Sequence, residues 1–182
     1  MPTLPVVAEW EPVSAGALEP WDGRHDRTEI EALAGDPAEI EALAGDRAEI
    51  EARARELGLQ PVRWPSRWPP DTSTAMLAAT YAKRVGRAVA FSLAAFRQEF
   101  AGGRDLGDRN TVLIAAAACE MHPTAVLKGI ALRSVRDALR DAGGRAQRAG
   151  VRGLPAIQVG RRVYEGLGSV AEAAAALGAG RD

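Results

Sequence analysis

The stretch Gly-Val-Arg-Gly-Leu-Pro at residues 150–155 constrains the fold more than any other part of the sequence. Its glycines predict a helix end and a tight turn, and its proline can begin a strand because it has no N–H to give to a ladder. Since X-Pro is the one peptide bond in which cis costs little, we predict a cis bond between Leu154 and Pro155. A strand at 156–159, a turn, a strand at 163–164 and a helix at 169–177 are then expected in that order.

Two segments ahead of this stretch are expected to be extended. Val7, Trp10 and Val13 alternate with polar residues, which predicts one strand over residues 5–13, followed by a linker rich in Gly, Pro and Asp. Residues 64–70 hold too many prolines for a helix, so they predict an extended strap with Trp64 and Trp68 as aromatic anchors.

Apolar residues recur at helical spacing over most of residues 71–149. The expected helices run from a cap within residues 71–74 to about 102, from a cap at Asp108 or Asn110 to about Cys119, from His122-Pro123 to about Ile130, and from Leu132 to Ala149. A glycine at 150 would then end the last of them.

A decapeptide repeat occupies residues 29–55, with two close copies that begin at Glu29 and Glu39 and a decayed third copy. Successive copies would fall about 80° apart on one helix, so the period matches neither the 7- nor the 11-residue coiled-coil repeat. The Gly-Asp pair that closes each copy predicts a helix stop followed by a cap. We interpret the repeat as a local duplication that lengthens a loop or a helix start, with an acidic partner-binding helix as the alternative.

Length and charge limit the classes of partner. The 182 residues suffice for one domain with a core, and a net charge of −1 argues against nucleic acid or an anionic membrane as the main partner. No apolar run approaches the ~20 residues of a membrane span, and the first residues lack the parts of a signal peptide. We expect a cytoplasmic protein that binds no nucleic acid and no membrane.

The single cysteine, Cys119, excludes an internal disulfide and a CxxC redox pair within this chain. It lies near the end of an apolar helical run, away from the helix N-terminus or cationic neighbour that activates a thiol, so we interpret it as a small buried side chain. His25 and His122 have no metal-ligand spacing, and no serine lies in a nucleophile elbow. The sequence therefore predicts no metal site and no hydrolase.

In this order, the features resemble the DsbA-like branch of the thioredoxin fold, which contains 2-hydroxychromene-2-carboxylate isomerases and kappa-class glutathione transferases. Gly-Val-x-Gly-x-Pro at 150–155 is the most specific part and is similar to the cis-proline loop of that family. The resemblance covers residues 5–14 and 57–178, and it includes Trp10-Glu11-Pro12-Val13 as the family's second strand and Trp64-Pro65 with Pro69-Pro70-Asp71-Thr72 as its strap.

The resemblance implies an incomplete thioredoxin-like α/β fold with a large α-helical insertion. Residues 1–20 and 150–182 would form the partial thioredoxin-like domain, 21–70 a linker with the repeat and the strap, and 71–149 the helical insertion. In intact relatives the cis-proline holds the backbone of the residue before it beside the reactive thiol.

The site implied by the resemblance takes glutathione or another low-molecular-weight thiol, and no metal. Its partners would be a small-molecule substrate or a disulfide, with a homodimer as a candidate assembly. The implied residues are the thiol-ligand loop of Gly153, Leu154 and Pro155, and a cleft lining of Trp68, Asp71 and Ser169.

Two departures from the family bear on activity. The family opens with a strand and a Ser/Cys-Pro-x-x turn that carries the catalytic residue, and this chain starts after that unit, so we expect no catalytic residue in this chain. Residues 165–169, Glu-Gly-Leu-Gly-Ser, also lack the Asp-Arg pair that relatives often carry before the last helix.

Without the opening strand, two sheet edges would face a gap with unpaired backbone groups. A mis-set start is the favoured explanation; a strand from a neighbouring chain and a rearranged sheet are the alternatives. The leading hypothesis for function is a thiol-disulfide oxidoreductase or thiol-dependent isomerase in its intact form. The competing hypothesis is a non-catalytic thiol-ligand-binding or assembly module.

Overall fold

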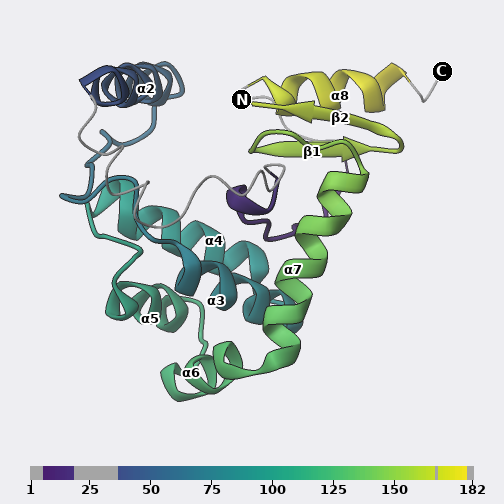
Figure 1. Ribbon diagram of the computed structural model, residues 1–182. Coiled ribbons are helices and arrows are strands. Elements are labelled where there is room, and N and C mark those ends of the chain that lie inside the picture. Colours follow the sequence, from purple (N-terminus) through teal and green to yellow (C-terminus); the bar gives the residue numbers. More distant parts are fainter. Residues whose placement is uncertain (1–5, 19–36, 167, 180–182) are drawn as a thin grey trace. The chain divides into compact units, whose positions relative to one another are not determined.

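The computed structural model of the chain describes residues 6–18, 37–166 and 168–179. The chain divides into two compact units, Pro20–Arg63 and Met1–Glu19 with Trp64–Asp182, which we describe separately (Figure 1). None of the helices in the described ranges combines the length and the apolar character that a membrane crossing requires.

The unit Pro20–Arg63 contains one long helix, α2, over Pro37–Glu56. The expected helix stop at Gly45–Asp46 is wrong, because α2 continues through both residues. A glycine inside a helix costs only about 1 kcal/mol, and the helix formers on either side of it outweigh that cost. The first copy of the repeat, residues 29–36, lies outside the described residues.

In the larger unit, four α-helices and a π-helical turn form what we call the helical group. They are α3 (Ser73–Arg84), α4 (Ala88–Phe96), η2 (Arg97–Ala101), α5 (Arg109–Ala118) and α6 (Pro123–Ala131). The group encloses an alanine-rich core, and its largest members include Phe91, Val112 and Val126, each at most 1% exposed. Small buried side chains let these helices approach one another closely.

The starts of α5 and α6 follow the cap signals in the sequence. The Asp108 carboxylate accepts the N–H groups of Asn110 at 3.1 Å and Thr111 at 3.2 Å, and these bonds lower its pKa. His122 Nδ1 accepts the Thr124 N–H at 3.2 Å, with Pro123 in the first turn. The expected helices at 108–119 and 123–130 are therefore confirmed.

The single helix expected from residues 71–74 to about 102 is wrong, since the chain turns between α3 and α4. Gly86 has a φ of 73°, a left-handed conformation that other residues adopt only with strain, and the Arg87 N–H closes the end of α3 on the Ala82 carbonyl at 2.7 Å. Beyond α4 the helix widens into the π-helical turn η2.

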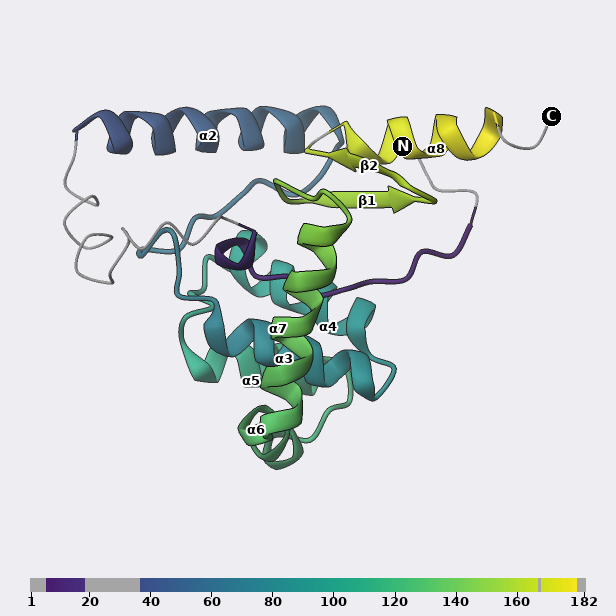
Figure 2. The ribbon, with the colours of Figure 1, turned by 45° about the vertical axis from the view of Figure 1, so that its right-hand side comes forward.

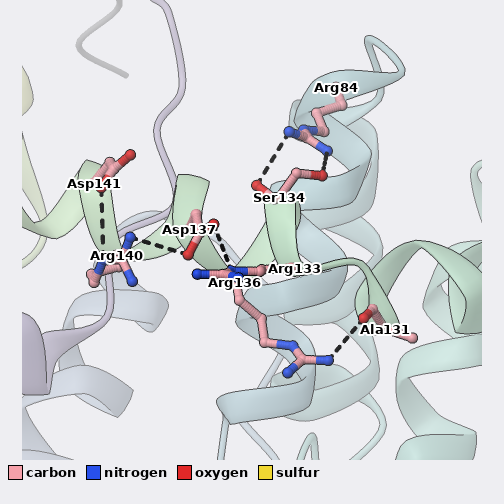
Figure 3. A network of polar contacts seen from close by, with 8 residues as sticks. All are labelled: Arg84, Ala131, Arg133, Ser134, Arg136, Asp137, Arg140 and Asp141. Atoms are coloured by element: carbon pink, nitrogen blue, oxygen red, sulfur yellow. Dashed lines mark hydrogen bonds and ion pairs between the residues drawn. The ribbon is translucent and has the colours of Figure 1, made fainter.

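Helix α7 (Arg133–Arg148) leads from the helical group to the sheet, as both ribbon views show (Figures 1 and 2). Its first turn is anchored by Arg84, which donates to Ser134 Oγ at 2.9 Å, and by Arg136, which donates to the last carbonyl of α6, Ala131, at 2.8 Å (Figure 3). Asp137 and Arg140 pair on the same exposed face at 3.1 Å. The expected helix at 132–149 is confirmed.

Strands β1 (Ala156–Val159) and β2 (Arg162–Glu165) form an antiparallel two-stranded sheet. Ile157 lies opposite Tyr164, and Val159 lies opposite Arg162. Helix α8 (Ser169–Ala179) packs along both strands and completes the strand-turn-strand-helix order expected from the sequence (Figure 2).

The strand expected over residues 5–13 is not formed in its described part, residues 6–13. This segment is extended but pairs with no other strand, and Val7 and Trp10 are exposed. Ion pairs hold it instead, because Lys83 binds Glu9 at 2.9 Å and Glu11 at 2.7 Å. An alternating pattern gives a strand only where a neighbouring strand offers hydrogen bonds, and the described residues offer none here.

The short helix η1 (Ala15–Ala17) then docks the segment on α7. The contact is close at Gly143, where an added Cβ would come within 2.6 Å of Ala17 Cβ. A glycine in the middle of α7 is therefore explained by this approach.

Candidate functional site

The candidate site is the loop between α7 and β1, residues 151–155, which we call the cis-proline loop. It follows the end of α7 at Arg148, and Gly150, with a φ of 86°, turns the chain away from the helix axis. The Val151 N–H binds the Ala146 carbonyl at 3.0 Å and the Gly150 N–H binds the Gln147 carbonyl at 3.0 Å, the paired bonds of a glycine-terminated helix. The loop therefore starts from a fixed point.

The Glu165 carboxylate holds the middle of the cis-proline loop. Its Oε1 accepts the Arg152 N–H at 2.6 Å and the Gly153 N–H at 3.1 Å. These two bonds, the Arg152 bond first, hold the pKa of Glu165 below its usual range. An ionised carboxylate at the end of β2 thus binds two successive backbone donors 12 and 13 residues earlier in the chain.

Leu154 is the next residue, and its backbone N–H, unlike those of Arg152 and Gly153, has no partner among the described residues. The Leu154–Pro155 peptide bond is cis, and the Pro155 carbonyl accepts the Gly166 N–H at 2.9 Å. The N–H and C=O of Leu154 make no hydrogen bond with any described residue, and its side chain is exposed. Leu154 therefore has an unpaired N–H and an unpaired C=O, and the residues before and after it in the cis-proline loop are held by hydrogen bonds.

Further unpaired backbone N–H and C=O groups lie along the outer edge of β1. Because Pro155 and Gly166 are a hydrogen-bonded pair, the alternation of an antiparallel ladder makes Ile157 and Val159 the residues that bond to β2. The N–H and C=O groups of Ala156 and Gln158 consequently point to the other side, where no described strand lies. From Leu154 to Gln158 the chain presents backbone groups that can pair with an extended peptide.

The six site residues implied by the family resemblance lie in two places. Ser169 is buried at the first turn of α8 and donates its N–H to the Gly166 carbonyl at 3.2 Å, close in the chain to the partners of the loop. Trp68 and Asp71 lie in the strap that precedes α3. Whether both groups line one cleft stays a prediction.

The strap is packed by aromatic edges. Trp68 lies 4.8 Å from Trp64 and 5.9 Å from Phe100 between ring centroids, and Trp64 lies 5.8 Å from Phe100. The Asp71 carboxylate accepts the Ser73 N–H at 3.0 Å where α3 begins. Residues 64–70 form no helix and carry Trp64 and Trp68 as aromatic anchors, as expected, but the expected extended course is wrong for residues 66–69, where the chain bends.

Next to this aromatic cluster, Glu99 is a titratable residue that sequence reasoning missed. It lies in η2, is 3% exposed, and its Oε1 has no hydrogen-bond partner. Burial raises its pKa to about 7, and the negative charge of Asp105 adds to the effect. Nothing in the local sequence distinguishes it, since a π-helical turn moves one residue inward out of the α-helical order.

Cys119 is buried at the end of α5 and donates to the Ala116 carbonyl at 3.1 Å. Burial raises the pKa of its thiol, which therefore stays protonated near neutral pH. The interpretation of Cys119 as a small buried side chain is confirmed. Within the described ranges, no cluster of three or more His, Cys, Asp or Glu side chains is arranged to hold a metal ion.

The strand-turn-strand-helix unit, its cis-proline loop and the helices before it define a thioredoxin-like α/β fold with a helical insertion. The chain belongs to the DSBA-like thioredoxin domain family, whose model matches residues 26–178. No curated protein matches the chain.

Among solved structures, that of selenomethionine-labelled 2-hydroxychromene-2-carboxylate isomerase is similar, with a TM-score of 0.72. The likeness covers 92% of this chain and 77% of that chain at 12% sequence identity, so it shows the fold. Both the family and the incomplete thioredoxin-like fold with a helical insertion agree with the resemblance described above.

Proposed function

We propose that this chain is the thiol-ligand-binding part of a DsbA-like enzyme and that Leu154 pairs with a peptide-like thiol such as glutathione. One observation carries the proposal: the open N–H and C=O of Leu154 in a loop that Glu165 and Gly166 fix on either side. A peptide ligand would donate an N–H to the Leu154 carbonyl and accept the Leu154 N–H on its own carbonyl, as a short antiparallel strand does.

The fixed loop lowers the cost of binding. Since the Glu165 carboxylate already holds the N–H groups of Arg152 and Gly153, little further ordering of the loop is needed when the ligand arrives. The cysteinyl residue of the ligand would then lie alongside Leu154, with its thiol directed to whichever group activates it.

The reaction is proposed from the family. In the isomerase form, a serine of the opening turn activates the ligand's thiol; in the oxidoreductase form, a cysteine there exchanges disulfides. Cys119 supplies neither role, because its thiol is buried and its pKa is raised. The proposal therefore assigns the nucleophile to an opening strand and turn outside these 182 residues. That strand would pair with the outer edge of β1, at Ala156 and Gln158.

A second candidate is a non-catalytic module that binds the same ligand. It is favoured by residues 165–169, which lack the Asp-Arg pair that relatives often carry before the last helix. The coding sequence upstream of Met1 separates the two: an in-frame strand followed by Ser-Pro or Cys-Pro-x-Cys supports the enzyme, and its absence supports the module. The cytoplasmic location stays a prediction with either function.

Titration of the ¹⁵N-labelled chain with reduced glutathione tests ligand binding. We expect the amide signals of Gly153, Leu154 and Ala156 to shift, and S-methylglutathione to shift the same signals because the backbone is what is recognised. Leu154→Pro removes the N–H and should abolish the shifts, whereas the matched control Leu154→Ala keeps the N–H and should retain them. Unmoved loop signals at millimolar glutathione, or equal binding by Leu154→Pro, would contradict the proposal.

An insulin reduction assay tests the role of Cys119. We expect no thiol-disulfide oxidoreductase activity from the 182-residue chain and no change in Cys119→Ser, since the one thiol has no second cysteine in this chain. Activity that is present in the wild type and lost in Cys119→Ser would overturn this assignment.

A further inference from the structure

The π-helical turn η2 holds the strap through the ring of Phe100. This ring meets Trp64 and Trp68 edge to face, at 5.8 Å and 5.9 Å between ring centroids. Both tryptophans are half-buried, and edge-to-face contacts of this kind depend on ring orientation as well as on burial. A movement of η2 that carried Phe100 away would therefore loosen the strap.

The residue before Phe100 is buried at a cost. Glu99 is 3% exposed, and its Oε1 has no hydrogen-bond partner in the part of the chain that the structure describes. A neutral carboxyl group can tolerate such surroundings, whereas a carboxylate there would be a buried charge without compensation. Ionisation of Glu99 therefore favours any rearrangement that brings its side chain into water.

A second contact with the strap follows Glu99 in the chain. The Asp105 carboxylate accepts the Gly107 N–H at 2.7 Å. Gly107 in turn lies close to the end of the strap, since an added Cβ would come within 3.4 Å of both the backbone N and the backbone O of Asp71. Two segments that contact the strap, at Phe100 and at Gly107, are thus linked to Glu99 and to Asp105.

The surrounding charges do not favour an ionised Glu99. Helix α4, which packs against η2, carries no titratable side chain. The charged side chains on the neighbouring segments are Arg67 and Asp71 of the strap, Arg97 of η2, and Arg104, Asp105 and Asp108 of the loop after η2. All of them except Asp105 are exposed and screened by water, and Asp105 has the same sign as ionised Glu99.

We propose that Glu99 is a proton-dependent switch for the strap: protonated and buried, it keeps Phe100 seated on Trp64 and Trp68, and ionised, it moves into water and releases them. A π-helical turn holds one residue more than an α-helical turn, so η2 can rearrange without unwinding α4. This inference does not depend on the thiol-ligand proposal.

The direction of the switch follows from the pKa of Glu99, which burial and then Asp105 raise from 4.5 to about 7. Because the folded state holds the proton more tightly than the unfolded chain does, the closed strap is favoured below pH 7 and weakened as the pH rises through 7.

Acrylamide quenching of tryptophan fluorescence tests the proposal. In a Trp10→Phe/Trp21→Phe background, Trp64 and Trp68 are the remaining tryptophans. We expect the quenching constant to be at least about twofold higher at pH 8.5 than at pH 5.5, because local opening exposes both rings. Glu99→Gln in the same background should keep the low value at both pH values, since its amide never ionises. Far-UV circular dichroism establishes that the helices stay folded.

Asp105→Asn supplies a second variant with an intact Glu99. Its side-chain oxygen can still accept the Gly107 N–H, but the like charge beside Glu99 is gone, so the midpoint of the quenching curve should move to lower pH. The matched control is Glu120→Gln, which removes an exposed carboxylate and should keep the wild-type midpoint.

Three results would overturn the proposal. Equal quenching at pH 5.5 and pH 8.5 would show that the strap does not open, and a rise that Glu99→Gln retains would assign the titration to another group. A rise that coincides with loss of the far-UV signal would show unfolding of the helices in place of release of the strap.

Discussion

The helical group and the sheet of β1 and β2 with α8 differ in how completely their backbone polar groups are hydrogen-bonded and their apolar side chains are buried. The helical group caps α5 with Asp108 and α6 with His122, and it buries side chains such as Phe91 completely. The sheet leaves one edge of β1 unpaired, and the apolar side chains of both strands are only half-buried. The helical group therefore supplies its own caps and a buried core, whereas the described residues leave the outer edge of β1 free for a further strand.

The largest expected effect separates the two regions by stability. Phe91→Ala should lower the free energy of unfolding by about 3–5 kcal/mol, because it leaves a cavity in the core of the helical group. Ile157→Ala, in the half-buried β1, should cost no more than about 1–2 kcal/mol. Urea denaturation followed by circular dichroism measures both, and equal losses would show that the sheet is as tightly packed as the helical group.

The next effect concerns the pH dependence of the helical group. Glu99 has a pKa of about 7 in the folded protein against 4.5 in the unfolded chain, so the folded state holds the proton more tightly. The stabilisation is full below pH 4.5 and is lost as pH rises through 7, which amounts to roughly 1–3 kcal/mol.

Glu99→Gln should remove most of this pH dependence, because an amide of similar shape carries no charge at any pH. We expect the variant to match the wild type near pH 4 and to exceed its stability at pH 8, as measured by urea denaturation at both values. Glu120→Gln, an exposed residue, serves as the control and should keep the wild-type slope. A wild-type slope in Glu99→Gln would show that another group titrates in this range.

A smaller effect is expected at the cis-proline loop. Glu165→Gln weakens the two bonds to Arg152 and Gly153, so the amides of these residues should exchange with solvent several-fold faster while the overall unfolding midpoint stays close to that of the wild type. The lowered pKa of Glu165 means that its ionised form is the one the fold stabilises, so its contribution is lost as pH falls through the folded pKa.

Hydrogen exchange measures this change when the rate of each amide is compared with its intrinsic rate in an unfolded chain. Glu172→Gln is the control, since Glu172 is exposed on α8 and should leave the loop amides unaffected. Unchanged exchange at Arg152 and Gly153 in Glu165→Gln would mean that the loop is held by other contacts.

Local signals in the sequence predicted much of this fold. A side-chain cap at Asp108, the His122-Pro123 start and the glycine at 150 each act within a few residues, and the helices that they bound lie where expected. The antiparallel strands on either side of Gly160 were predictable for the same reason.

Features that depend on distant partners were not predicted. Residues 6–13 alternate like a strand, but no described strand lies beside them. The continuation of α2 through Gly45 was missed for a local reason, since the helix formers on either side outweigh the cost of one glycine. In the candidate site, Leu154 and Pro155 follow from the glycine-proline pattern. The role of Glu165 does not, because its partners lie 12 and 13 residues away across a sheet whose register the sequence does not specify.

Hydrogen exchange of the 182-residue chain, resolved to single amides, tests the central claim most directly. We predict strong protection throughout the helical group and an alternation within β1, where the Ile157 and Val159 amides exchange more slowly than those of Ala156 and Gln158. That pattern would show one edge paired to β2 and the other open beside the Leu154 site. Equal and strong protection of all four amides in a monomer would contradict the account, because the β1 edge would then already be covered.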